Sequence, residues 1–323
     1  MPYKKVKLNH ISLKALEVGH IYKYPIFYQD GEGIFVKLIE INESFSSRIT
    51  DTINQKKIKD VYVLTKDYQN YELDTQQYLA MLIKKEDTPI SLKFEIVQDL
   101  TAETMNNLFH GEVDTQMLKS VNVLLDDTID MILHEKSAIK AMLDVTSYDY
   151  YTYTHCVNVS LYTLGFGAYL NIEKEKLLLL GKAALLHDLG KKDIPNEIVN
   201  KNGALTEDEF KIMQQHPSFS VNILKQMGET NHILLDTIEQ HHEKLNGTGY
   251  PYGLKKDEIN SFAQIVAIAD IFDALTTKRS YKNALKTFEA LDIMHNEMKD
   301  ELNVTLLNEF ITFMSEKTIK SIH

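Results

Sequence analysis

Histidine and aspartate residues in the second half of this chain occur in an order that is best explained by a metal site. The series contains a single histidine, a His-Asp doublet, a second histidine, a His-His doublet and an aspartate: His155, His187, Asp188, His216, His241, His242 and Asp270. Neutral imidazoles and carboxylates suit divalent ions such as iron, manganese, nickel and zinc. Such ions can activate water at neutral pH, so the series predicts a hydrolytic metal centre.

The segments that carry these residues are separate in sequence and have a helical pattern, so their side chains must converge in space. Helix bundles build dinuclear sites in their interior in this way. Neighbouring residues of one helix do not face the same direction. The doublets His187-Asp188 and His241-His242 therefore need a cluster across their shared edge, a helix end or a distorted turn.

The composition is that of an ordinary globular protein, with 44% hydrophobic and 25% charged residues in a chain of 323. This length suggests two domains or one large domain. The net charge of -11 argues against a broad surface that binds DNA or RNA. A small anionic substrate remains compatible with this charge, because bound cations can dominate the field inside a cleft.

A single cysteine, Cys156, excludes an internal disulfide and fits a reducing compartment, and we expect it to be structural. The N-terminal residues contain no apolar core of signal-peptide length. The most apolar run, residues 177–186, contains Lys182 and is too short to cross a bilayer. We therefore expect no membrane span and a cytoplasmic location.

Residues 1–86 mix strand and helix patterns and are predicted to form a small α+β regulatory or interaction domain. Segments 21–27 and 34–41 flank a glycine-rich turn, which predicts a hairpin. A helix is expected over 44–55 and a strand over 61–64.

Residues 87–136 are predicted to form a helical connector, with an amphipathic helix over 114–134. A homodimer or another protein partner could bind through this connector or the first domain. The remaining residues, 137–323, are predicted to be almost entirely helical. Within them, Thr206 and Glu209 have the spacing of a capping box.

Three segments carry a family resemblance: LLHDLGKKDIPNEIVNKNGALTEDEF, HHEKLNGTGYP and FAQIVAIADIFDALTTKRSYKNAL. Over about residues 140 to 300 the chain resembles the HD-GYP subgroup of the HD-domain metal-dependent phosphohydrolases. The resemblance implies an α-helical HD-domain bundle, here preceded by the small α+β domain and the connector. It also implies hydrolysis of the bacterial second messenger cyclic di-GMP to pGpG, to GMP, or to both.

The resemblance further implies two metal ions that share Asp188 and hold a bridging hydroxide as the nucleophile. One ion would be bound by His155, His187, Asp188 and Asp270. The other would be bound by His216, His241, His242 and Asp188. Iron or manganese is favoured, and zinc or nickel would also accept these ligands.

Other positions are assigned to the substrate and to support of the ligands. Lys191 is expected to act with Asp188 in catalysis and to bind phosphate oxygens. Arg279 and Lys282 would bind a substrate phosphate, and Tyr250 would contact the substrate or order its loop. Asp273 lies three residues after Asp270, and we expect it to hydrogen-bond a ligand or water without binding metal itself.

Three positions depart from the family pattern. Tyr151 stands where some members have a glutamate for a third metal, so two ions are expected. Asn246 replaces the aspartate of the usual DGSGYP loop, and Ser280 replaces a common proline. These changes leave open two alternatives to cyclic di-GMP hydrolysis: a cyclic-dinucleotide binding module with little turnover, and a phosphohydrolase for another cyclic dinucleotide.

Overall fold

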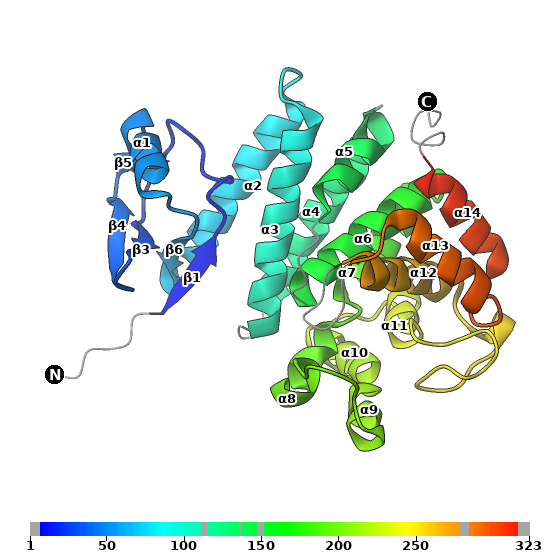
Figure 1. Cartoon of the computed structure of the whole chain (residues 1–323). Coiled ribbons are helices and arrows are strands. Elements are labelled where there is room, and N and C mark those ends of the chain that lie inside the picture. Colours follow the sequence, from blue (N-terminus) through cyan, green and yellow to red (C-terminus); the bar gives the residue numbers. More distant parts are fainter. Residues whose placement is uncertain (1–6, 111–114, 136, 147–151, 278–283, 316–323) are drawn as a thin grey trace. The chain divides into compact units, whose positions relative to one another are not determined.

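The computed structural model describes residues 7–110, 115–135, 137–146, 152–277 and 284–315. The chain divides into two compact units, Met1–Glu103 and Thr104–His323, which we call unit 1 and unit 2. Figure 1 shows that the described strands gather in the first part of the chain and that helices make up the rest. This is the expected class: a helical bundle preceded by a small α+β region.

Unit 1 contains a four-stranded antiparallel sheet with the order β1-β6-β3-β4. Its strands are β1 (Leu8–Ile11), β6 (Val61–Leu64), β3 (Ile26–Gln29) and β4 (Phe35–Ile39). The short strands β2 (Ile21–Tyr22) and β5 (Glu43–Ser44) form a separate pair. The helical elements are α1 (Ser47–Lys56), η1 (Thr65–Asp67) and α2 (Tyr68–Lys84).

The predicted hairpin is confirmed, because β3 and β4 pair across the glycine-rich turn. The predicted first strand over 21–27 is divided, however, into β2 and β3. Pro25 lies between the two pieces and has no N–H to donate to a strand ladder. Helix α1 begins three residues after the expected position, and the strand over 61–64 is confirmed.

The core of unit 1 follows the two-residue period of an extended chain. Tyr22, Tyr24, Ile26 and Tyr28 are buried, so alternate residues from 22 to 28 face the same side. They pack in one cluster with residues from the other strands, such as Val61. The sheet therefore presents one face to the apolar core.

Helix α3 (Ile90–His110) contains the division between the two units. Unit 2 continues with α4 (Thr115–His134), α5 (Ala138–Val145), α6 (Thr152–Tyr169) and α7 (Lys174–Leu186). The predicted connector thus consists of two helices, and α4 packs on α6 and α7 within unit 2. The boundaries 1–86, 87–136 and 137–323 stay a prediction.

The remaining elements of unit 2 follow α7 in the chain. They are η2 (Leu189–Asp193), α8 (Asn196–Val199), α9 (Glu207–Met213), α10 (His216–Gln226), α11 (His232–Glu239), η3 (Lys256–Glu258), α12 (Ser261–Thr276), α13 (Thr287–Glu297) and α14 (Val304–Met314). The predicted capping box at the start of α9 is confirmed. None of the helices in the described ranges is both long and apolar enough to cross a membrane.

Helices α6, α7 and α12 form the centre of unit 2 and pack against one another. The second half of α7 is buried on every side, from Leu180 to Leu186, which is the pattern of an interior helix. Gly181 allows α6 and α7 to approach closely, because an added Cβ would lie 2.5 Å from a methyl carbon of Leu164. The metal-ligand candidates lie where these central helices end or meet.

Candidate metal centre

The structure brings all seven ligand candidates of the sequence together. His155 lies on α6, Asp270 lies on α12 and His216 begins α10. The two doublets lie at the ends of α7 and α11. Their ligand atoms form three groups, each within 4.8 Å: Asp188, His216, His241 and His242; His155, His187 and Asp188; and His187, His241 and Asp270. Asp188 belongs to two of the groups, as a shared ligand would.

Both doublets reach the cluster because a helix ends beside them. Helix α7 ends at Leu186, and Asp188, with φ -96° and ψ 2°, leads into the 3-10 turn of η2. Likewise α11 ends at Glu239, so His241 and His242 lie in the turn that follows. The change of backbone direction lets adjacent side chains point into one site, as the sequence required.

Three of the histidines are oriented by the same local hydrogen bond. Nδ1 of His187 lies 2.7 Å from the carbonyl oxygen of Ala184, three residues earlier. His216 bonds the carbonyl of Met213 at 2.7 Å, and His241 bonds that of Ile238 at 2.6 Å. Because a carbonyl only accepts, Nδ1 must carry the proton. In the neutral ring, the lone pair is then on Nε2, which faces the cluster.

His155 is oriented by a carboxylate in place of a carbonyl. Its Nδ1 donates to Oδ2 of Asp273 at 2.7 Å, which directs Nε2 toward Oδ1 of Asp270, 3.1 Å away. The other oxygen of Asp273 accepts hydrogen bonds from Asn158 and Thr277. Asp273 is completely buried and belongs to none of the three ligand groups. Its position matches the supporting role expected from the sequence.

The cluster contains polar atoms whose lone pairs lack a donor. Nε2 of His187 and Oδ1 of Asp188 are buried and have no hydrogen-bond partner among the described residues. Nε2 of His216 lies 3.1 Å from Oδ1 of Asp188 and 3.4 Å from Nε2 of His241. Buried lone pairs that face one another cost free energy unless a cation lies between them. The donor set therefore fits a divalent metal.

The electrostatics of the site favour the protonation states that bind metal. Burial lowers the pKa of His187 and His241, and it lowers the pKa of His242 to about 3. Burial alone would raise the pKa of Asp188, but Lys191 and His187 hold it well below its usual value. Burial opposes ionisation of Asp270 too, yet the adjacent ring of His155 keeps that pKa well below its usual value. Neutral imidazoles and ionised carboxylates are the ligand forms.

Lys191 and Tyr250, which the sequence assigned to the substrate, lie at the edge of this cluster. Nζ of Lys191 donates to Oδ2 of Asp188 at 2.5 Å, and its side chain is 17% exposed. The ring of Tyr250 lies 4.7 Å from that of His242, with Phe210 at its edge. The other substrate residues that the sequence suggested, Arg279 and Lys282, lie outside the described residues, as do Tyr151 and Ser280.

The sequence did not single out Glu243 or Ser220, which hold the two loops of the site. The buried carboxylate of Glu243 accepts hydrogen bonds from the backbone N–H groups of Tyr252, Gly253 and Leu254. Ser220 donates to the carbonyl of His187 and accepts from the N–H of Gly190. The position of Glu243 before a glycine-rich loop was a signal in the sequence that could have identified it. Nothing in the sequence marks Ser220.

Asn246, which departs from the usual loop aspartate, still orders the loop locally. Its Oδ1 accepts hydrogen bonds from the backbone N–H and the hydroxyl of Thr248, at 3.0 and 2.6 Å. An amide oxygen makes these contacts as an aspartate oxygen would. The replacement of aspartate therefore leaves this part of the loop anchored.

Comparisons with known proteins give the same fold and family. The chain is 33% identical over 168 residues to cyclic di-GMP phosphodiesterase PA4108 of Pseudomonas aeruginosa, covering 52% of this chain and 41% of that protein. It is 39% identical over 148 residues to 3'3'-cGAMP-specific phosphodiesterase 3 of Vibrio cholerae, covering 46% and 32% of the two chains. The matched regions thus span less than half the length of these curated relatives.

A solved structure extends the likeness to nearly the whole chain. Bd1817, an HDG"Y"P protein from Bdellovibrio bacteriovorus, superposes with a TM-score of 0.72 at 19% identity, covering 94% of this chain and 98% of that one. At this identity the match shows a shared fold. The family model described as "HD domain" matches residues 126–306, which contain all seven ligand candidates. The chain therefore belongs to the HD-domain family.

Proposed function

We propose that this protein hydrolyses cyclic di-GMP to pGpG, to GMP, or to both. The observation that carries the proposal is the largely buried cluster of seven ligand candidates, in which Nε2 of His187 and Oδ1 of Asp188 have no hydrogen-bond partner in the described structure. The activity named for the relative from Pseudomonas aeruginosa supports this substrate. Unit 1 would then supply regulation or a contact with a partner or second copy.

The ligand groups accommodate two divalent ions, and we assign iron or manganese to them, with zinc or nickel as alternatives. His155, His187, Asp188 and Asp270 would hold one ion, and His216, His241, His242 and Asp188 the other. Bound there, the ions would activate a bridging water and polarise phosphoryl oxygens. Asp188 contributes as the ionised carboxylate common to both sets.

Lys191 supplies the protein's own positive charge beside the reacting phosphate. Its position on η2 holds Nζ against Asp188, and its partial exposure would let it donate to a phosphate oxygen. A fixed ammonium group there stabilises charge that develops on the phosphoryl oxygens. The ring of Tyr250 packs against that of His242 with a tilt of 33°, and it would form part of the wall that a substrate contacts.

A second candidate substrate is a mixed cyclic dinucleotide. Two relatives from Vibrio cholerae named 3'3'-cGAMP-specific phosphodiesterases are 39% and 40% identical to this chain over the matched residues. The cluster itself does not discriminate between bases, because metals and Lys191 contact phosphate. A binding module with little turnover is less consistent with the structure, since Asn246 keeps its loop ordered.

The test is turnover by full-length protein loaded anaerobically with iron or manganese. Cyclic di-GMP, 3'3'-cGAMP and cyclic di-AMP are incubated separately, and the products are separated by chromatography. We expect pGpG or GMP from cyclic di-GMP at the highest kcat/KM. Faster turnover of 3'3'-cGAMP would select the second candidate, and no product from any of them would refute hydrolysis.

Two lysine variants sharpen this test. Lys191→Met should lower kcat by about 10²- to 10³-fold, the usual effect of removing one electrostatic contact to a transition state. Metal content should be retained, because Lys191 is not a ligand candidate. The control is Lys211→Met, which removes an exposed lysine of α9 that pairs only with Asp208 in the described structure. Equal activity of the two variants would contradict the assigned role.

A further inference from the structure

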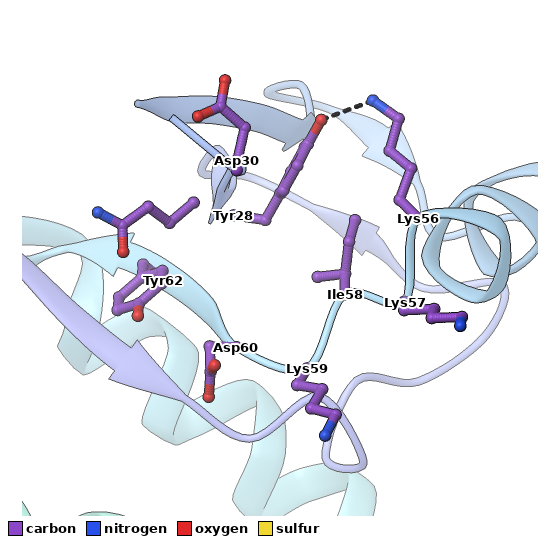
Figure 2. Close-up of a pocket in the computed structure, with 10 residues that line it drawn as sticks. Tyr28, Asp30, Lys56, Lys57, Ile58, Lys59, Asp60 and Tyr62 are labelled. Atoms are coloured by element: carbon purple, nitrogen blue, oxygen red, sulfur yellow. Dashed lines mark hydrogen bonds between the residues drawn. The ribbon is translucent and has the colours of Figure 1, made fainter. Parts of the chain in front are cut away.

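Unit 1 contains a cavity of about 520 Å³ that lies entirely within described residues. Figure 2 shows the side chains of Tyr28, Ile58 and Tyr62 around this space, with Lys56, Lys57 and Lys59 along one side. A volume of this size is within the range of small-molecule sites in proteins. The HD-domain match begins only at residue 126, so this cavity lies outside the domain that carries the metal centre.

The wall of the cavity is positively charged in a protein that is acidic as a whole. Most of the net charge of -11 comes from unit 2, whereas acidic and basic residues nearly balance in unit 1. Lys57 and Lys59 are exposed, and neither has a carboxylate partner among the described residues. In Figure 2 both side chains start at one side of the space and point away from it, so a change of rotamer would bring the ammonium groups over the opening.

The other charged side chains that line the cavity make contacts of their own. Lys56 donates to the hydroxyl of Tyr28 at 2.7 Å, and Asp30 accepts two backbone hydrogen bonds within the β3–β4 turn. Oδ1 of Asp60 lies 3.2 Å from Nε2 of His10. The lining thus carries three lysines and two aspartates, a net charge of +1, with Lys57 and Lys59 as the groups suited to phosphate oxygens.

The lining also includes the aromatic ring of Tyr62, which we call the floor of the cavity. The ring of Tyr62 is half-buried and makes T-shaped contacts with the rings of Phe35 and His10, at centroid distances of 5.0 and 5.5 Å. Ile58 is a further apolar residue of the lining. An aromatic face fixed in this way offers a stacking surface for a planar ring, worth roughly 1–3 kcal/mol for a nucleic-acid base.

The lysine wall is preformed by the end of α1. Lys57 ends this helix in the left-handed conformation, with φ 53°, and the backbone N–H of Ile58 bonds the carbonyl of Ile53. Glycine is the usual residue at such a position, because a side chain there costs about 1–2 kcal/mol. A lysine at this position places a positive charge directly on the rim.

We infer that this cavity binds a mononucleotide, with its base on Tyr62 and its phosphates at Lys57 and Lys59. The ring of Tyr62 offers a stacking surface for a flat base, and Lys57 and Lys59 offer positive charge to the phosphates. The second oxygen of Asp60, beside Tyr62 in Figure 2, can accept a hydrogen bond from an N–H group of the base. This site would recognise its ligand independently of the metal centre and of hydrolysis.

The experiment is equilibrium dialysis of full-length protein with GTP, ATP, GMP and AMP, in excess EDTA so that no metal-dependent turnover occurs. We expect saturable binding of at least one nucleotide, and competition by pyrophosphate but not by the phosphate-free nucleoside. The variant Lys57→Glu/Lys59→Glu should weaken binding at least tenfold. Lys66→Glu reverses the charge of an exposed lysine of unit 1 that does not line the cavity, and it should change affinity less than twofold.

A second variant tests the stacking surface. Tyr62→Leu keeps an apolar side chain but removes the ring, and it should weaken nucleotide binding several-fold while leaving competition by pyrophosphate unchanged. Circular dichroism of each variant verifies that the sheet is intact. Equal affinity of wild type and the double lysine variant, or no saturable binding of any of the four nucleotides, would overturn the inference. Neither result would affect the turnover assay, which tests the proposed hydrolysis separately.

Discussion

At the scale of single residues, hydrogen bonds decide which ring nitrogen each histidine presents to the metal centre. In His187, His216 and His241, the carbonyl three residues earlier holds the proton on Nδ1. His155 depends on Asp273 for the same purpose, across 118 positions of sequence. Local backbone therefore sets three of the rings, whereas one ring depends on a distant carboxylate.

This dependence predicts the effect of Asp273→Asn. The amide cannot accept from Nδ1 of His155, from Asn158 and from Thr277 as the carboxylate does, so the ring loses its fixed tautomer. We expect metal affinity to fall by about 10- to 100-fold, measured by competition with a chromogenic chelator. Thr277→Val removes only one hydrogen bond from the same carboxylate and serves as the control. Unchanged affinity in Asp273→Asn would show that this contact does not support the ligand.

At the scale of whole elements, helices contribute to the metal centre through the positions at which they end. The 3-10 turn η2 follows α7 directly and packs on α10, which brings Asp188 and His216 to the same place. Glu243 performs a similar function for the loop that follows α11, by binding three consecutive backbone N–H groups. These two contacts position the loops of the site more than any helix propensity does.

Gly190→Ala should separate η2 from α10. An added Cβ would overlap the carbonyl of His216 and the backbone nitrogen of Ser220, neither of which can rotate away. We expect a loss of about 1–3 kcal/mol of unfolding free energy from overpacking, together with weaker metal binding. Urea unfolding and chelator competition measure the two effects.

Gly228→Ala is the matched control for this substitution. Gly228 has φ 87° and open space around an added Cβ, so alanine there brings backbone strain without a clash. It should cost about 1–2 kcal/mol and leave metal affinity unchanged. Equal metal affinities in the two variants would contradict the proposed coupling of η2 to the site.

Glu243→Gln should loosen the loop that carries Tyr250. Glutamine keeps one acceptor oxygen, so at least one of the three N–H groups loses its partner, at a cost of about 1–3 kcal/mol. We expect faster limited proteolysis within residues 244–256 and a higher KM for cyclic dinucleotides. Glu258→Gln, an exposed glutamate that accepts one hydrogen bond from Lys255, is the control. Identical cleavage rates in the two variants would count against the anchoring role.

At the scale of the whole molecule, the two units differ in the ionisable groups that they bury. Unit 2 buries its charged groups around the metal cluster, whereas unit 1 buries Glu103 among the backbone of Ser12 and the hydroxyls of Tyr68 and Tyr71. Burial raises the pKa of Glu103 to about 8, although these three donors oppose the shift. Stability of unit 1 should therefore depend on pH.

The direction of this dependence follows from proton binding. Between the ordinary value of 4.5 and about 8, folded unit 1 holds more protons than the unfolded chain, so stability falls as pH rises. The slope should approach about 1.4 kcal/mol per pH unit within this window and vanish above it. Urea unfolding at several pH values measures it, with hydrogen exchange of β3 and β6 peptides assigning the transition to unit 1. Glu103→Gln should flatten the dependence, and an equal slope in the variant would exclude Glu103 as its source.

Much of the site could be predicted because ligand chemistry depends on residue identity and order. Histidines and aspartates in seven positions indicated a metal centre, and the doublets indicated the helix ends that the structure contains at α7 and α11. The split of the first predicted strand was also readable, since Pro25 cannot donate to a ladder. The substrate assignments of Arg279 and Lys282 stay predictions.

The sequence by itself determined the helical bundle, the ligand set and the loop segments, because periodicity and side-chain chemistry are local properties. Only the tertiary structure showed that Ser220 lies across from Gly190 and that Glu243 lies beneath its loop. It also decided that His155 is the ligand candidate that Asp273 supports. The same holds for the lysine-lined cavity of unit 1, whose walls come from residues 28 to 62. These contacts join residues that are distant in sequence or lie in irregular loops, and no periodic pattern records them.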